Sequence, residues 1–261
     1  MRFNTTKRLL RAGKPAIGGW LTFPSVNVAE AMAHAGWDWV TVDAEHGAMS
    51  IEMLNNMFTA IGTTAAMPLC RIPDNDPVWI KRILDAGAMG IIVPMVCSAT
   101  EAADAVAAAK YPPAGIRSAG GGRWRYWAGE DYPQYADDEI LVVVMIEHID
   151  AVERVEDILS VPGVDACFIG PNDLAWSMGL GKGPGANDPS HAKAVARVLE
   201  GAKKVGVPAG IHCRSVEEVW RRAEQGFQFL ACTSDHAMLF NTARDAAKQI
   251  RQKIGRPEVG E

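Results

Sequence analysis

The feature that most constrains the fold of this chain is a regular alternation of short apolar runs with amphipathic helical segments. Eight apolar runs of strand length recur along the 261 residues, and each is followed by residues spaced as on one face of a helix. Such alternation with short connections is typical of parallel strands joined by crossover helices. Eight units in a chain of this length predict a (β/α)8 barrel, the TIM barrel.

The boundaries of these units follow from where the apolar runs stop. We expect strands at Ala16–Phe23, Trp39–Asp43, Met67–Ile72, Gly90–Val96, Ile140–Glu147, Ala166–Gly170, Pro208–Cys213 and Phe227–Thr233. We expect helices at Val28–Ala35, Ile51–Ile61, Pro77–Ala86, Thr100–Lys110, Ala151–Ser160, His191–Val205, Val216–Gln225 and Leu239–Ile254. A doubly wound sheet is the alternative, but it would usually carry a glycine-rich first turn, where this chain has Phe23-Pro24-Ser25. Residues 1–261 are expected to form one domain.

Composition and charge exclude several classes of protein. The net charge is −5, so nothing favours a nucleic-acid partner or a polybasic membrane contact. No apolar run reaches the length of a transmembrane helix, and the N-terminus lacks the apolar core of a secretory signal. The five cysteines are odd in number and lie in or just after predicted strands. They suit reduced thiols, so we expect a cytoplasmic protein.

Two predicted strands end in carboxylates that can act together. Glu147 ends the fifth strand, and Asp173 follows the sixth. Strand ends converge at the mouth of an α/β barrel, where chemistry is usually done. Either carboxylate alone could simply cap the helix that follows it. Two on neighbouring strands favour a hard-oxygen site for Mg²⁺ or Mn²⁺, because buried like charges repel unless a cation offsets them.

Other titratable groups follow the second and third strands. His46 follows the second strand and is a candidate general acid/base, although a polar loop with a satisfied histidine is the alternative. Arg71 ends the third strand, where a guanidinium can bind a carboxylate in bidentate fashion. Asp85 closes the third helix, and it is either a helix-end polar residue or a partner that orients the histidine.

The remaining candidates concern substrate contacts. In Gly170-Pro171-Asn172, the glycine permits close approach of a ligand and the following amides can hold a carboxylate. Trp20 ends the first strand, where it forms either an apolar wall of the pocket or ordinary barrel packing. Ile211, in the seventh strand, is also expected to contact substrate.

Two long segments interrupt the alternation. Pro112–Glu139 precedes a strand, so it begins on the face opposite the mouth. To act in chemistry it would have to climb the outside of the barrel or serve a neighbouring subunit. Ser177–Pro189 follows the sixth strand on the active face, where it is either a mobile lid or a plain surface loop.

The combined pattern resembles the HpcH/HpaI family of metal-dependent, class II pyruvate aldolases. The resemblance runs from about Asn4 to Ile254 and rests on motifs that occur in the same order and spacing. These motifs are Val42-Asp43-Ala44-Glu45-His46-Gly47, Arg71, Leu84-Asp85-Ala86-Gly87-Ala88, Val93-Pro94-Met95-Val96, Ile146-Glu147 and Phe168-Ile169-Gly170-Pro171-Asn172-Asp173-Leu174.

The resemblance implies cleavage or formation of 4-hydroxy-2-oxoacids through a pyruvate enolate, with an aldehyde as partner. It implies that Glu147 and Asp173 hold Mg²⁺, Mn²⁺ or Co²⁺, which pyruvate chelates. It implies that Arg71 binds the ketoacid and that His46, oriented by Asp85, moves protons. It also implies a hexamer, arranged as a trimer of dimers, in which the helix over residues 239–254 docks on a neighbouring subunit.

Two departures from the family pattern leave alternatives open. Met145 stands where members often carry glutamine, and residues 117–126 differ from the usual aldolase loop. The aldehyde partner is therefore undefined by the resemblance. An oxaloacetate decarboxylase, or another lyase that forms the same enolate, is one alternative. A barrel that binds ketoacid without turnover is another.

Overall fold

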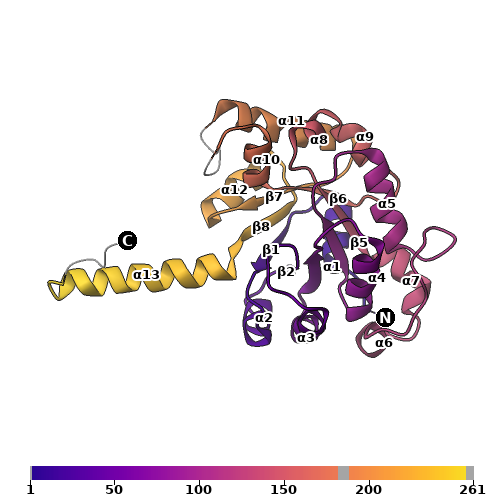
Figure 1. The fold of residues 1–261 in the computed structure, drawn as a ribbon, viewed down its shortest axis with the longest axis horizontal. Helices are drawn as coiled ribbons and strands as arrows, with labels where there is room; N and C mark the ends of the chain where they lie inside the picture. Colours follow the sequence, from indigo (N-terminus) through magenta and orange to yellow (C-terminus); the bar gives the residue numbers. More distant parts are fainter. Residues whose placement is uncertain (1, 182–187, 257–261) are drawn as a thin grey trace.

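The eight predicted strands form one closed parallel barrel, in which each strand pairs with the next and β8 pairs with β1. The structure is a computed structural model that describes residues 2–181 and 188–256 (Figure 1). Its strands are β1 (Ala16–Leu21), β2 (Trp39–Asp43), β3 (Met67–Arg71), β4 (Gly90–Val93), β5 (Leu141–Met145), β6 (Ala166–Ile169), β7 (Ala209–Cys213) and β8 (Phe229–Ser234). The predicted TIM barrel is confirmed, and most strand ends fall within two residues of the predicted ones.

Helices lie outside the barrel (Figure 1). Those that match predicted segments are α2 (Val26–Ala33), α3 (Ile51–Ile61), α4 (Pro77–Ala86), α5 (Ala99–Ala109), α11 (Pro189–Val205), α12 (Val216–Gln225) and α13 (Asp235–Lys253). The predicted helix after β5 is divided at Arg154 into α8 (Ile149–Glu153) and α9 (Val155–Leu159).

Among the described residues, four short helices escaped prediction. They are α1 (Thr5–Arg11), α6 (Trp124–Trp127), α7 (Tyr132–Glu139) and α10 (Pro171–Ser177). Each has eight residues or fewer, which is too short for an apolar period to stand out. Consequently Pro112–Glu139, which we expected to be irregular, contains two helical segments. This segment lies beside the N-terminus, where the Arg2 amide donates to the Ala128 carbonyl.

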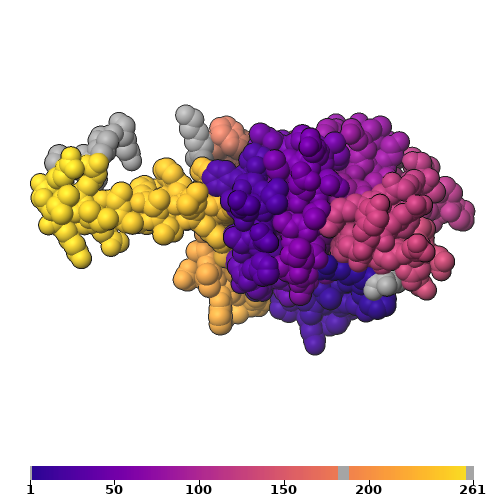
Figure 2. All heavy atoms as spheres, turned by 90° about the horizontal axis from the view of Figure 1, so that it is seen from below, coloured from indigo at the N-terminus to yellow at the C-terminus, as the bar shows by residue number. Residues whose placement is uncertain are grey.

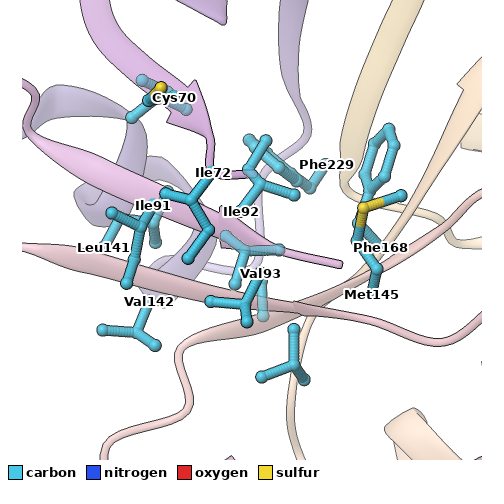
Figure 3. Packing of buried hydrophobic residues seen from close by; sticks show 14 of the residues in the cluster. Cys70, Ile72, Ile91, Ile92, Val93, Leu141, Val142, Met145, Phe168 and Phe229 are labelled. Atoms are coloured by element: carbon cyan, nitrogen blue, oxygen red, sulfur yellow. The ribbon is translucent and has the colours of Figure 1, made fainter. Parts of the chain in front are cut away.

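The barrel interior is filled by large side chains rather than left open. Trp39 stacks on Phe229 with 4.3 Å between ring centroids, and Phe168 meets Phe229 edge to face. Gly18 makes room for this packing, because a Cβ there would lie 2.0 Å from the Trp39 ring. Figure 3 shows Phe168 and Phe229 among the aliphatic side chains of neighbouring strands. In the described part of the chain, these side chains therefore fill the barrel interior below its mouth.

The C-terminal helix α13 projects away from the barrel (Figures 1 and 2). Asp235 at its start is buried, whereas Leu239, Phe240 and Ile250 expose more than half of their surface. Apolar side chains left in water on an amphipathic helix mark a surface that the described residues of the chain leave exposed.

Two expectations from composition can be compared with the structure. All five cysteines are free. Within the described residues, none of the helices combines the length and the apolar character that a membrane crossing requires.

Candidate active site

A cavity of about 380 Å³ opens at the C-terminal ends of the strands. This is the face on which (β/α)8 barrels carry their active sites, and the volume suits a small ligand. The cavity is lined by Trp20, Thr22, Asp43, His46, Arg71, Met145, Phe168, Gly170, Pro171, Asn172, Asp173, His212, Arg214 and Ser234. Most of the site residues predicted from the sequence are in this list.

Asp43, which the sequence analysis did not select, organises one side of the cavity. It lies opposite Arg71 in the register of β2 and β3. Its Oδ1 accepts from Arg71 Nε at 3.0 Å, and its Oδ2 accepts from Arg71 Nη2 at 2.6 Å. Its Oδ2 also accepts from Trp20 Nε1 at 3.2 Å. This bidentate pair fixes the guanidinium plane and the indole together.

Burial and charge oppose each other on this side of the site. Burial alone would raise the pKa of Asp43, but the Arg71 hydrogen bonds and charge hold that pKa below its usual value. Glu45 contacts Arg71 Nη1 at 2.9 Å, yet burial raises the pKa of Glu45 above its usual value. Arg71 therefore has Asp43 as its permanent partner, with Glu45 as a weaker second anion.

Glu147 lies on the other side of the barrel mouth and is only 2% exposed. Its Oε1 accepts from the Met95 amide at 2.9 Å, whereas its Oε2 is buried and has no hydrogen-bond partner among the described residues. Burial raises the pKa of Glu147 to about 7, and the negative charge of Asp173 acts in the same direction. An unpaired buried carboxylate oxygen is unfavourable unless a cation or a proton reaches it.

The segment that follows β6 meets this carboxylate closely. A Cβ at Gly170 would lie 2.2 Å from Glu147 Oε2, so only glycine leaves that oxygen free. Asp173 lies in the first turn of α10 and lines the cavity. His191 Nε2 contacts the Pro171 carbonyl at 2.9 Å and helps hold the turn in place.

This donor set fits a hard divalent cation. Two carboxylates supply charge, and the vacant oxygen of Glu147 lies beside the glycine that leads into the helix carrying Asp173. In the described residues, no cluster of three or more His, Cys, Asp or Glu side chains suited to a metal occurs. A cation here would therefore take its other ligands from water and substrate, as Mg²⁺ commonly does.

His46 stands at the rim of the cavity. Its side chain is 65% exposed, and its Nε2 lies 3.8 Å from Glu45 Oε2. Its backbone amide donates to Asp43 Oδ1 at 3.2 Å. The same carboxylate thus positions both Arg71 and the turn that carries the imidazole.

Asp85 does not join this group within one chain. It lies in the last turn of α4, which leads into the start of β4, so it belongs to the face opposite the cavity. There its Oδ1 pairs with the buried Arg117 Nη2 at 2.8 Å, and its carbonyl accepts from the Arg123 amide. The expected orientation of His46 by Asp85 is therefore not achieved by residues of the same chain.

The residue of β7 that reaches the cavity is not the expected one. Ile211 is fully buried and does not line the cavity, whereas the next residue, His212, does. Successive side chains of a strand point to opposite faces, so only one of the two can enter the barrel. His212 meets Trp20 edge-on, with 5.5 Å between ring centroids. His212 in β7, Arg214 just after β7 and Ser234 at the end of β8 belong to none of the sequence motifs, and only closure of the barrel brings them to the site.

The second long segment, Ser177–Pro189, is only partly described. Its start continues from α10 on the cavity side of the barrel, and Ser177 Oγ accepts from the Ile149 amide at 3.0 Å. Residues 182–187, on which the expectation of a lid rests, lie outside the described residues.

Comparisons with known proteins agree with this geometry. Residues 17–242 match the family model described as HpcH/HpaI aldolase/citrate lyase. The chain is 42% identical to a hydroxypyruvate/pyruvate aldolase of Sagittula stellata, with 92% of this chain and 95% of that protein covered. It is 37% identical to a 4-hydroxy-2-oxo-heptane-1,7-dioate aldolase of Escherichia coli, with 95% of each covered.

A solved structure gives the same result. A HpcH/HpaI aldolase/citrate lyase family protein from Burkholderia cenocepacia J2315 superposes with a TM-score of 0.90 at 33% identity. The match covers 95% of this chain and 99% of that one.

The partly buried His212 makes stability depend on pH. Burial lowers the pKa of His212 to about 4 from its usual 6.5, so between these values the unfolded chain binds the proton and the folded protein does not. Stability is therefore lost as the pH falls. Relative to His212→Asn, the wild type should lose about 2 kcal/mol of unfolding free energy between about pH 7.5 and about pH 5. Urea denaturation of both proteins measures this, and an unchanged difference would contradict it.

Proposed function

Because this chain belongs to the HpcH/HpaI aldolase/citrate lyase family and is a carbon–carbon lyase, we propose that it cleaves and forms 4-hydroxy-2-oxoacids, with pyruvate and an aldehyde as the cleavage products. The observation that carries the proposal is the unpaired Glu147 Oε2 at the barrel mouth. Glu147 itself does not line the cavity, but this oxygen lies directly beside Gly170, which does, so it marks a place for a cation at the edge of a cavity that also presents Arg71.

The proposed metal ligands are Glu147 and Asp173, with Mg²⁺, Mn²⁺ or Co²⁺ as the ion. When bound there, a divalent cation supplies the positive charge that stabilises the enolate oxygen of a ketoacid. Gly170 keeps the Glu147 oxygen accessible, and the Met95 amide holds the rest of that carboxylate in place. The chain thus contributes charge and a fixed orientation at this point.

Arg71 and the start of α10 are the proposed ketoacid contacts. Asp43 already fills two of the donors of Arg71 and Glu45 contacts its Nη1, so the guanidinium is held rigidly in the lining of the cavity. The amides of Asn172 and Asp173 belong to the first helical turn, where no intrahelical acceptor is available. Together they can bind the carboxylate of pyruvate, with Trp20 and Phe168 as apolar walls.

His46 is the proposed proton carrier. In cleavage, the 4-hydroxyl loses its proton as the bond between carbons 3 and 4 breaks, and carbon 3 later gains one. The exposed imidazole lies at the rim of the cavity beside Glu45, where it can exchange protons with water. A role for Asp85 in orienting it requires a second copy of the chain, since Asp85 of the same chain lies on the opposite face.

Metal dependence is the most direct test of the function. In D2O with pyruvate and Mg²⁺ or Mn²⁺, the enzyme should exchange the methyl protons of pyruvate, because exchange requires the enolate. Treatment with EDTA should abolish exchange, and adding the metal back should restore it. Glu147→Gln and Asp173→Asn should each slow exchange about 100-fold or more by removing charge from the site.

Proton NMR follows this exchange without knowledge of the aldehyde. Asp165→Asn is a matched control, because Asp165 pairs with Lys7 away from the cavity. Full exchange after rigorous chelation would end the metal-dependent proposal. A protein that binds metal and pyruvate without any exchange would be a ketoacid-binding barrel instead of an enzyme.

His46→Asn should separate binding from proton transfer. The variant should bind Mg²⁺ and pyruvate as the wild type does, because neither proposed metal ligand nor Arg71 is altered. Its rate of aldol cleavage should fall about 100-fold or more, the usual contribution of a general acid or base. Calorimetry measures binding, and pyruvate release measures rate. Wild-type turnover would remove His46 from the mechanism.

We also propose that the chain forms a homo-oligomer, a hexamer built as a trimer of dimers, in which α13 docks on a neighbouring subunit. The support is the exposure of Leu239, Phe240 and Ile250 on a helix that leaves the barrel. Sedimentation velocity should give a hexamer for the wild type and smaller species for Phe240→Asp. A monomeric wild type would contradict this proposal.

A further inference from the structure

One carboxylate at the barrel mouth, that of Glu45, has no part in the proposed metal and ketoacid contacts. Glu45 stands two residues after β2, and its side chain is 18% exposed. Its Oε2 lies 2.9 Å from Arg71 Nη1 and 3.8 Å from His46 Nε2. Among the described residues, no other carboxylate lies within ion-pair distance of the His46 ring. Glu45 is therefore the acid that this imidazole meets within its own chain.

The turn that carries both residues is fixed from below. Asp43 Oδ1 accepts the backbone amides of Glu45 and His46, each at 3.2 Å. The two side chains thus leave from a backbone held by one buried acceptor. The His46 ring is 65% exposed, so packing restricts its rotation little. An anion beside Nε2 gives the ring a preferred direction that packing does not supply.

Arg71 does not use up the carboxylate of Glu45. Asp43 already binds Arg71 through two hydrogen bonds. The contact between Arg71 and Glu45 lacks hydrogen-bond alignment, because Glu45 Oε2 is buried and accepts no hydrogen bond from the described residues. This oxygen keeps its capacity to accept one. A protonated His46 can supply the donor, since hydrogen bonds between catalytic groups are often long before substrate is bound.

The charges around Glu45 favour a proton on the neighbouring imidazole. The charged groups of other elements that act on Glu45 come from β2, β3, α10 and the residues after β5, and they are Asp43, Arg71, Asp173 and Glu147. Burial raises the pKa of Glu45 and the nearby carboxylates act in the same direction, whereas Arg71 and protonated His46 lower it. Because the interaction is mutual, the Glu45 anion in turn stabilises the imidazolium.

We propose that Glu45 is a positioning residue, whose carboxylate orients the His46 ring and stabilises the imidazolium that forms during aldol cleavage. The inference rests on the proposed aldolase function and on His46 as its proton carrier. With Nε2 directed at Glu45, Nδ1 takes the proton of the 4-hydroxyl group. The bond between carbons 3 and 4 breaks, the aldehyde carbonyl forms, and the electron pair passes to the enolate. His46 then gives up its proton, and Glu45 remains ionised throughout.

The test follows the release of pyruvate from 4-hydroxy-2-oxopentanoate, the adduct of pyruvate and acetaldehyde. Glu45→Gln should lower kcat about tenfold or more, the effect of losing one hydrogen bond to a charged group. The acid limb of its pH–rate profile should move to lower pH by about half a unit or more, because the imidazolium loses its anion. Calorimetry should show unchanged binding of Mg²⁺ and pyruvate, since Asp43 still holds Arg71. Glu45→Asp keeps the charge and should restore part of kcat.

A double variant separates action through His46 from a general structural effect. In the His46→Asn background, adding Glu45→Gln should change kcat by less than about twofold, whereas independent effects would multiply. Glu156→Gln is the matched control, because Glu156 is also a partly buried glutamate paired with an arginine, Arg197, but lies outside the cavity. It should keep the wild-type kcat and pH–rate profile.

Two results would overturn this inference. One is a Glu45→Gln variant with wild-type kcat and pH–rate profile, and the other is a tenfold loss that persists in the His46→Asn background. Exchange of pyruvate methyl protons in the wild type distinguishes the two levels. Absence of exchange overturns the aldolase proposal and this inference with it, whereas normal exchange with an unaffected Glu45→Gln variant overturns only the role of Glu45.

Discussion

The buried pair of Asp43 and Arg71 is the interaction on which the geometry of the barrel mouth depends. One carboxylate receives two hydrogen bonds from the guanidinium, one from the Trp20 indole and two from the turn that carries His46. Removing the charge of Arg71 would leave Asp43 buried and uncompensated, which commonly destabilises a protein by about 3–5 kcal/mol. The pair therefore contributes position more than net stability, because it fixes an arginine, an aromatic wall and a histidine relative to one another.

The opposite side of the mouth is arranged to keep one oxygen unsatisfied. Met95 has a left-handed backbone with φ of 53°, which is unfavourable for a residue with a side chain, and its amide donates to Glu147. Burial and the nearby charge of Asp173 raise the pKa of Glu147 to about 7. Both features are unfavourable in the folded chain alone. A cation at this oxygen would offset the cost of burying the carboxylate, as the proposed function requires.

Much of the fold could be predicted because a buried parallel strand is a run of apolar residues that ends where the chain meets solvent. β2 and α3 have the predicted boundaries, and the carboxylate after β6 and the arginine of β3 were found as the first charges at the end of such runs. Asp43 could have been found in the same way, since it ends β2 in register with Arg71.

Other features depend on information that local sequence does not contain. Asp85 lies in a motif that resembles the family. The end of the barrel on which it lies is set by its position in the last turn of α4, just before β4. Ile211 and His212 are neighbours in β7, so their side chains point to opposite faces of the strand. The alternation alone does not say which of the two faces the barrel interior, and that is settled only by how the strands pair in the closed barrel. Arg214 and Ser234 are separated by nineteen residues of helix and strand, and only the pairing of β7 with β8 places them on one wall.

The aromatic packing inside the barrel has a consequence for the size of molecule that the cavity can take. Trp39 and Phe229 stack beneath Phe168, which itself lines the cavity, so these rings form a solid floor. A longer compound cannot sink deeper, and each added carbon must extend outward toward solvent. Tolerance for long molecules would then be governed at the rim, by side chains that can vary without disturbing the interior.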